Sequence, residues 1–326
     1  MKTKRIGTWI LLFGGMLMGF LGLVPAGETA ESEYPNRPIQ VIVPWGPGSA
    51  SDLNSRIFAP HLEKTLKQPL IIVNKPGGGG ILGHTLIAKA KPDGYTLGLV
   101  STVFGIYFLT HKDLEFNLES FTPIYAYAKV PMFFSVRSDA PWKTLKDFIA
   151  DAQKNPGKLR YSTFGAFTLP HLATSDLCKK AGIELTLIPH AGVGDVLTAL
   201  IGGHVEMAVT HGSAGHLTGG TIRALAVADR ERLVDYPNIP TLTELGFPIV
   251  CYPILGHVTP KGTSPKVIAK LVQGYKEAMG KKGEAIADPL KKLEQYVVMM
   301  GPDEYAKRMK DDTDYLTQIF KGIKLQ

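Results

Sequence analysis

Two glycine-rich turns, each placed directly after a short apolar run, constrain the fold more than any other feature of this chain. The first run and its turn cover residues 41–52 (VIVPWGPGSASD), and the second cover residues 71–83 (IIVNKPGGGGILG). A buried strand that ends in a Gly/Ser turn and continues into a helix leaves unpaired backbone N–H groups that point at one place. We therefore predict strand–turn–helix units in which the two turns form one anion site.

Short apolar runs alternate with helical patterns along the remaining chain, which predicts a layered α/β architecture with mainly parallel strands. We expect strands at 39–43, 70–74, 96–100, 133–136, 159–162, 185–188, 205–209, 222–227 and 254–258. We expect helices at 52–66, 82–91, 144–152, 170–181, 194–202, 265–279, 284–292 and 303–321. Thr144 followed by Asp147 resembles a capping box.

The length of 326 residues is enough for two domains, because single hydrophobic cores stop growing near ~250–300 residues. Strand patterns early and late in the chain surround a self-contained middle, which indicates an inserted domain. We expect one lobe at 34–130 plus 253–326 and a second lobe at 131–252. The chain would cross between the lobes near 129–132 and near 249–253.

The N-terminus is typical of an export signal, with a basic start, an apolar stretch at 8–24 and small residues after it. Cleavage is expected after Ala26, with Ala30 as a second candidate. An uncleaved membrane anchor is the alternative, since the apolar stretch is near the ~17–25 residues that span a bilayer. No cysteine lies near the expected cleavage site, which excludes a lipoprotein anchor.

The formal net charge of +7 is mild once the three cationic residues of the export signal are set aside, which leaves +4. The remaining Lys and Arg are scattered among acidic residues, as at 307–312 (KRMKDD). Such mixed runs are typical of solvated helix faces and exclude a basic stripe for nucleic acid.

Signals for catalysis and for metal binding are weak or absent in this sequence. The nine histidines include no His-x-x-x-His pair and no HExxH motif, and there is no G-x-S-x-G elbow or P-loop. Residues 78–83 fit G-x-G-x-x-G, yet the following strand ends in Ser101 and Thr102 in place of the acidic residue of a dinucleotide fold. The two cysteines, Cys178 and Cys251, are free thiols or a single disulfide.

The first glycine-rich turn offers an apolar wall at Trp45 and close backbone approach at Gly46, Gly48 and Ser49. We expect Ser51 to cap a helix that begins at Asp52, and Asp52 to complement the helix dipole as a structural residue. A flexible turn without a ligand is the alternative for the glycine run at 77–80.

Several ordered motifs together resemble one known family. They lie at residues 34–52, 74–83, 91–97, 223–227, 235–241 and 259–265. Over essentially the whole mature chain the sequence resembles the TctC/Bug family, the periplasmic substrate-binding proteins of tripartite tricarboxylate transporters. The resemblance implies an α/β fold: a two-lobed, type II-like periplasmic-binding-protein clamshell with two crossover segments. It also implies a periplasmic, monomeric receptor that delivers a small organic carboxylate to inner-membrane transporter subunits, without catalysis, cofactor or metal.

The resemblance also implies a set of ligand contacts drawn from both lobes. In the first lobe these are Trp45, Gly46, Pro47, Gly48, Ser49, Ser51, Gly77, Gly78, Gly79, Gly80, Ser101 and Thr102. In the second lobe they are Thr163, Phe164, Gly165, Ala166, Thr168, His190, Ala191, Thr210 and His211. Backbone amides of the first lobe would hold one carboxylate, while Thr163, Thr168 and His190 would hold the distal end of the ligand.

The chain departs from the family pattern at a few of these positions. Thr210 stands where many members carry Asp, Ser49 stands where a second glycine is usual, and Phe164 and Phe167 replace small or polar residues. Fewer acids and more aromatic surface suit a more apolar carboxylate, unless both phenylalanines only pack. Dicarboxylate, tricarboxylate, aromatic acid and amino acid all remain open as ligands. Two rival functions are a receptor for a membrane sensor and an enzyme that uses His190 or His211.

Overall fold

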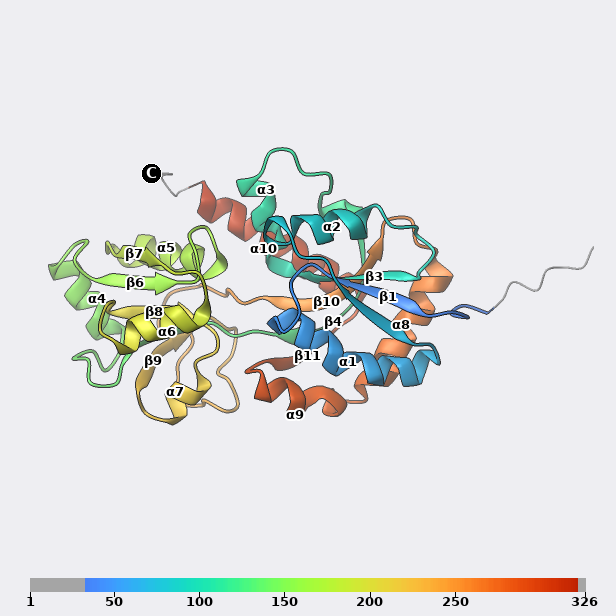
Figure 1. Cartoon of the computed structure of the whole chain (residues 1–326). Coiled ribbons are helices and arrows are strands. Elements are labelled where there is room, and N and C mark those ends of the chain that lie inside the picture. Colours follow the sequence, from blue (N-terminus) through green and yellow to red (C-terminus); the bar gives the residue numbers. More distant parts are fainter. Residues whose placement is uncertain (1–32, 322–326) are drawn as a thin grey trace, which may run out of the picture. The chain divides into compact units, whose positions relative to one another are not determined.

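The computed structural model describes residues 33–321, so the expected export signal at 1–26 lies outside the described residues. The described chain forms a six-stranded and a five-stranded sheet, here called the first and second sheets (Figure 1). Within residues 33–321, no helix combines the length and the apolar character needed to cross a membrane.

The first sheet has the strand order β11-β4-β10-β3-β1-β2. Its strands are β1 (Ile39–Val43), β2 (Leu70–Asn74), β3 (Thr96–Ser101), β4 (Phe121–Lys129), β10 (Ile254–Pro260) and β11 (Tyr296–Met300). β1 is parallel to β2 and β3, so the carboxyl ends of these three strands lie at one edge of the sheet. β10 is antiparallel to both β3 and β4, so it ends at the opposite edge.

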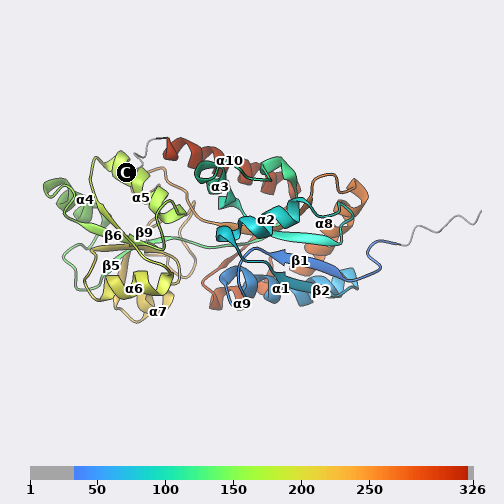
Figure 2. The same ribbon diagram turned by 45° about the horizontal axis from the view of Figure 1, so that its top comes forward.

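Helices cover both faces of the first sheet (Figures 1 and 2). One face carries α1 (Ala50–Leu66), α8 (Pro265–Met279) and α9 (Glu284–Lys292), which contact one another. The other face carries α2 (Ile81–Ala88), α3 (Ile106–Thr110) and the first turns of α10 (Pro302–Phe320). Three short 3-10 segments, η1 (Gly78–Gly80), η2 (Thr102–Gly105) and η3 (Leu118–Ser120), complete this part.

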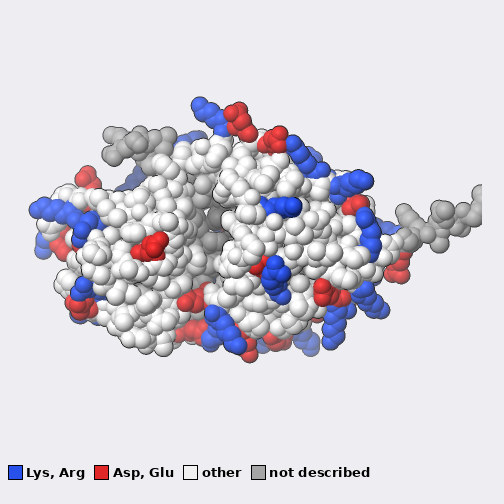
Figure 3. Space-filling view, viewed as in Figure 1, with Lys and Arg blue, Asp and Glu red and all other residues white. Residues whose placement is uncertain are grey.

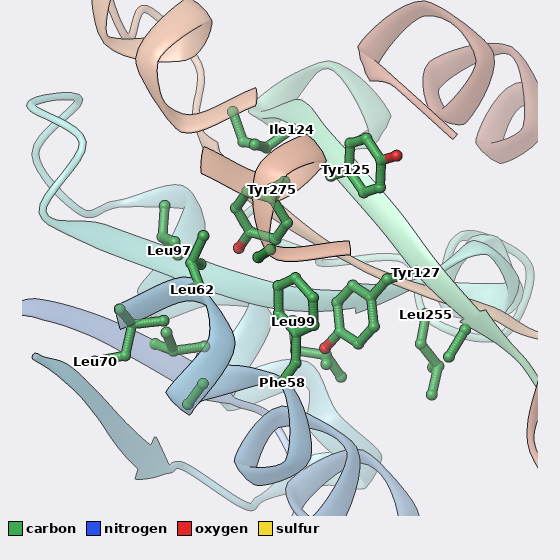
Figure 4. Close-up of a cluster of buried hydrophobic side chains, with 14 of the residues drawn as sticks. Phe58, Leu62, Leu70, Leu97, Leu99, Ile124, Tyr125, Tyr127, Leu255 and Tyr275 are labelled. Carbon is green, nitrogen blue, oxygen red and sulfur yellow. The ribbon is translucent and has the colours of Figure 1, made fainter. Parts of the chain in front are cut away.

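Stacked aromatic rings form the centre of the first core, between α1, α8 and the sheet (Figure 4). The Phe58 ring stacks on Tyr127 at 4.5 Å and on Tyr275 at 5.2 Å between centroids. His257 joins this stack: its Nδ1 lies 2.6 Å from the Tyr275 hydroxyl and its Nε2 lies 3.3 Å from the Tyr127 hydroxyl. The buried polar atoms of these rings therefore hydrogen-bond to one another, as burial in an apolar core requires.

The second sheet has the strand order β7-β6-β8-β5-β9. Its strands are β5 (Phe133–Arg137), β6 (Arg160–Thr163), β7 (Thr186–Pro189), β8 (Met207–Thr210) and β9 (Ile222–Val227). Its helices are α4 (Leu145–Lys154), α5 (Leu169–Ala181), α6 (Val193–Ile201) and α7 (Ala214–Thr218). β6 is parallel to β7 and β8, so the turns after these three strands share one edge.

The last helix, α10, contacts the cores of both sheets. Tyr305 and Met309 belong to a cluster on the first sheet, whereas Leu316 belongs to the cluster under α4 and α5. The Tyr315 hydroxyl donates to Asp176 Oδ2 of α5 over 2.8 Å. α10 therefore connects the two sheets in addition to the crossing segments of the chain.

Most expected elements are present, and Thr144 forms the expected capping box with Asp147. The α/β class is confirmed, but the expectation of mainly parallel strands is wrong. β4 and β5, which carry the chain from the first sheet to the second, and the returning β10 are antiparallel to their neighbours. Strands β4 and β11 and helices α3 and α7 were not expected at all. An apolar run indicates a strand, but the direction of its neighbours is decided by which segments pair.

Candidate functional site

The turns after β1, β2 and β3 meet at one edge of the first sheet because these strands are parallel and in register. Val43 is paired with Asn74 at the ends of β1 and β2, and Ile42 is paired with Gly98 of β3. The first-lobe candidates at 45–51, 77–80 and 101–102 are thus brought together at that edge (Figure 1).

Asp52 organises the turn after β1 from inside. Its side chain is buried, and its carboxylate accepts hydrogen bonds from Gly48 N (2.9 Å), Arg56 Nε (3.0 Å) and Asn74 Nδ2 (3.0 Å). Burial by itself raises the pKa of the Asp52 carboxyl, but these hydrogen bonds outweigh burial, and the pKa is lowered. Asp52 is therefore ionised and fully occupied by the turn, which makes it a structural residue.

The expected cap of α1 is wrong by two residues. Ser49, not Ser51, is the N-cap, because Ser49 Oγ accepts from Asp52 N over 3.2 Å and the helix begins at Ala50. The first helical N–H groups, those of Ala50 and Ser51, have no acceptor among the residues that the structure describes. The partly exposed first turn of α1 thus presents two free donors at the positive end of the helix dipole.

The turn after β2 has a backbone that glycine alone adopts readily. Gly77, Gly78, Gly79 and Gly80 all have positive φ, at 147°, 56°, 66° and 111°. The carbonyls of Gly79 and Gly80 accept hydrogen bonds from the protein, whereas the N–H groups of Gly78 and Gly79 have no acceptor among the described residues. Both glycines are exposed, so this turn also offers two free backbone donors.

His84 and Tyr107 support the glycine turn from behind. Tyr107 Oη donates to Gly79 O over 2.6 Å, and His84 Nδ1 lies 2.7 Å from Gly80 O. Because a carbonyl only accepts, Nδ1 carries the proton of the imidazole ring. The ring is fully buried, which lowers the pKa of His84 to about 4 although the bond to Gly80 opposes that shift. His84 is thus a neutral support for the turn at pH 7.

Ser101 and Thr102 lie at the same edge, but both side chains are buried. Thr102 Oγ1 accepts from Ile254 N over 3.3 Å, so this hydroxyl holds β10 in place. Ser101 Oγ has no partner among the described residues.

The second-lobe candidates lie on the turns after β6, β7 and β8, at one edge of the second sheet. Thr163 Oγ1 and Thr168 Oγ1 both donate to Gly165 O, over 2.9 and 2.8 Å. Ala166 is exposed between them, and Gly165 has φ +123°. The turn is therefore closed by two threonine hydroxyls on one carbonyl.

The phenylalanines of this turn make ring contacts inside the protein. Phe164 meets the His211 ring edge to face at 5.4 Å between centroids. Phe167 has the left-handed φ of +57°, and its ring lies 5.9 Å from Phe320 of α10. Its N–H donates to His171 Nδ1 over 2.8 Å, which holds this strained backbone in place.

His190, Ala191, Thr210 and His211 lie on the two neighbouring turns. His190 Nδ1 is 2.7 Å from Ser162 Oγ, but Ser162 is fully buried in β6, so this pair does not present a nucleophile. Thr210 is buried and donates to His211 O over 3.1 Å. Burial lowers the pKa of His211 to about 4, so its ring is neutral at pH 7. Ala191 is exposed.

Sequence reasoning missed three residues that shape the site: Asn74, His84 and Tyr107. Asn74 donates to both Trp45 O and Asp52 Oδ1, so it joins the turns after β1 and β2. The signal that could have found Asn74 is a polar residue at the end of an apolar run. His84 lies four residues after Gly80, one helical turn away, whereas nothing in the sequence indicates the contact of Tyr107 with Gly79.

Charged side chains of both signs are interspersed on the face shown in Figure 3, without a stripe of one sign. In residues 33–321, no group of three or more His, Cys, Asp or Glu side chains is placed to hold a metal ion. Cys178 and Cys251 are both free thiols.

Replacing Asp52 with alanine is expected to lower the free energy of unfolding by about 2 kcal/mol, because Gly48 N and Asn74 Nδ2 lose their acceptor. Urea denaturation at pH 7 measures the effect. Arg56→Ala is the control: that side chain is half exposed, and exposed ion pairs contribute about 0–1 kcal/mol. Equal losses in the two variants would show that the ion pair, and not the bonds to the turns, supplies the stability.

The comparison with a family model decides the family to which this chain belongs. The model of the tripartite tricarboxylate transporter family receptor, TctC, matches residues 55–325. The chain belongs to this receptor family. Members are periplasmic solute-binding proteins, so the fold and the family of this TctC receptor are those of receptors and not of enzymes.

Individual relatives of this TctC receptor agree with that assignment. A UPF0065 protein from the gbd 5' region of Cupriavidus necator is 35% identical over 297 residues, which cover 88% of this chain and 87% of that protein. A TctC solute-binding protein from Polaromonas, solved without ligand, matches with a TM-score of 0.81 and 28% identity, over 89% of this chain and 100% of that one. MatC from Rhodopseudomonas palustris, solved with bound malate, matches with a TM-score of 0.71 and 25% identity, over 88% and 100%.

Proposed function

We propose that this TctC receptor binds a small organic carboxylate, with one carboxyl group against the turns after β1 and β2. The observation that carries the proposal is the set of four free N–H donors, those of Ala50, Ser51, Gly78 and Gly79, at one sheet edge. Each hydrogen bond to a charged group contributes ~1.5–3 kcal/mol, so four donors are enough for micromolar affinity without a cationic side chain. The malate bound to MatC supports a carboxylate as the ligand class.

The rest of the function follows from a ligand that contacts both lobes. We assign the lobes as residues 34–130 plus 253–326 and residues 131–252, with the last turns of α10 packed on the second core. A ligand held by the turns of both sheets favours the closed arrangement of the lobes, and the closed form is what a membrane transporter recognises. The mature receptor acts in the periplasm after cleavage behind Ala26 or Ala30.

A thermal-shift screen of organic acids tests the ligand class. Ligand at 100 times its dissociation constant adds ~2.7 kcal/mol to the stability, which raises the melting temperature measurably. We expect at least one chemical class of carboxylates to raise the melting temperature and the matching methyl esters to leave it unchanged. The proposal is wrong if neutral compounds stabilise the receptor and no carboxylate does.

The variant Ser51→Asp is expected to weaken carboxylate binding at least tenfold, because a negative charge in the first turn of α1 opposes a second one at the same donors. Isothermal titration with the best acid of the screen measures the change. Ser264→Asp is the matched control: Ser264 is the N-cap of α8, at the opposite edge of the sheet, and aspartate is an equally good cap. Unchanged affinity in Ser51→Asp would remove the turn after β1 from the site.

A further inference from the structure

A groove of about 640 Å³ follows β9, the strand at one end of the second sheet in the order β7-β6-β8-β5-β9. None of the residues that line this groove is a candidate ligand contact, so the proposed function leaves it without a role. We infer that the groove binds an extended, acidic peptide segment of a partner protein, which pairs with β9 as a further strand.

The outer edge of β9 has backbone groups that pair with no other strand. Ser138 N donates to Thr221 O over 3.2 Å, so the backbone of Thr221 faces β5. Backbone groups of successive residues in a strand point to opposite sides, so those of Ile222 and Ala224 face away from β5. No described residue makes a backbone hydrogen bond to them on that side. This part of β9 is thus an unpaired edge, to which another chain can add through main-chain hydrogen bonds.

The far end of β9 shows that this edge accepts an added segment. Val227 N donates to Pro240 O, and Leu242 N donates to Val227 O, both over 3.0 Å. These two bonds form a parallel bridge between Val227 and Thr241. The chain itself therefore covers the last residue of β9, whereas residues 222–225, which line the groove, have no neighbouring strand on the outer side among the described residues.

Side chains on both faces of β9 line the groove. Leu225 belongs to the core under α4 and α5, whereas Ile222 belongs to the core that includes α6. Leu245, which also lines the groove, is 36% exposed. An added strand directs alternate side chains to the two faces of a sheet, so an extended segment finds apolar contacts on both.

The charge of the groove favours an acidic segment. Its charged lining residues are Lys143, Arg223 and Arg232, and no acid of the described chain lines it. Arg232 is paired with Glu244, but Lys143 and Arg223 form no ion pair with any residue that the structure describes. The Arg223 guanidinium donates instead to two backbone carbonyls, over 3.0 and 2.6 Å, and Asp147 is held in the capping box of α4. Two cations thus remain without an acidic partner beside the unpaired edge, and charge complementarity selects a segment that carries carboxylates.

Fluorescence anisotropy with defined peptides tests the inference on the full mature receptor. The probe is a labelled, capped peptide of about eight residues in which glutamate alternates with valine, and its control has lysine in place of glutamate. We expect the glutamate peptide to bind at least tenfold more tightly than the lysine peptide. The inference is overturned if the glutamate peptide does not bind, or if the lysine peptide binds as tightly. N-acetylglutamate that displaces the peptide at equal concentration also overturns it, because the groove would then be a site for small anions.

Two variants assign the binding to the edge of β9 and to its charge. Ala224→Pro removes an outward N–H, a change that an edge strand tolerates, and we expect it to weaken binding of the glutamate peptide at least tenfold. Lys143→Glu reverses an exposed charge of the groove and should weaken binding at least threefold. Lys146→Glu is the matched control, because Lys146 is exposed on α4 but does not line the groove.

The organic-acid screen of the proposed function, repeated on these variants, separates the two proposals. We expect the acids to raise the melting temperature of Ala224→Pro and Lys143→Glu as they do that of the wild type, which also shows that both variants are folded. If Ala224→Pro does not fold, Lys143→Glu against Lys146→Glu decides the test. Wild-type affinity for the glutamate peptide in the folded groove variants overturns the inference and leaves the proposed function untouched.

Discussion

Lowering the pH from 7 to 5 is expected to reduce the free energy of unfolding by several kcal/mol, because three histidines are buried in their neutral form. Burial lowers the pKa of His84 and His211 to about 4 and that of His257 to about 3. In the unfolded chain these groups titrate near ~6.5. Between pH 6.5 and 4 the unfolded state therefore binds more protons, so stability is present above this window and falls as the pH falls through it.

Each histidine accounts for about 2 kcal/mol of this loss between pH 7 and pH 5. Asp52 does not contribute there, because its pKa is lowered and its stabilisation is lost only at more acidic pH. Urea denaturation at a series of pH values measures how the free energy of unfolding changes with pH. A stability that stays constant from pH 7 to pH 5 would contradict the buried neutral state of these rings.

A pair of variants assigns part of the slope to one ring. In His84→Phe the titrating group is gone, and the new ring lies among Trp45, Phe104 and Phe116, so we expect the free energy of unfolding to depend less steeply on pH. Tyr107→Phe is the matched control, because it also removes one hydrogen bond to the glycine turn but no group that titrates in this range. The control should lower stability at every pH and leave the slope unchanged. If the free energy of unfolding depends on pH as steeply in His84→Phe as in the wild type, groups other than His84 account for that dependence.

Gly83→Ala is expected to lower the free energy of unfolding by about 3 kcal/mol. A Cβ atom on Gly83 would lie 2.6 Å from Pro44 Cα and 3.0 Å from Lys75 O, and both are backbone atoms that no side-chain rotation can move away. The change would therefore push α2 away from the ends of β1 and β2, where the candidate anion site lies. Chemical denaturation with circular dichroism detection measures the loss.

Gly46→Ala is the matched control in the neighbouring turn. No atom lies within 4 Å of a Cβ built there, so the same methyl group should change stability by less than ~0.5 kcal/mol. Wild-type stability in Gly83→Ala would mean that α2 does not approach Pro44 as closely as described.

The candidate site shows where sequence reasoning succeeds and where it stops. The glycine run at 77–80 needs positive φ at four successive residues, and this requirement is local, so the sequence indicates the turn directly. The predicted cap at Ser51 is wrong because several residues at 49–52 are able to cap a helix and the local sequence does not choose among them. The choice of Ser49 depends on where Asp52 is held, and Asn74, from a different strand, takes part in holding it.

The chain by itself determined the strand–turn–helix units, the glycine-rich turns and the family resemblance, because propensity, capping and turn geometry act over a few neighbouring residues. Only the tertiary structure decided that β4, β5 and β10 run antiparallel and that α10 joins both cores, since these depend on pairing between residues far apart in sequence. It also decided the chemistry of the turns. Whether a threonine hydroxyl or an N–H group is free depends on the partners that folding brings to it.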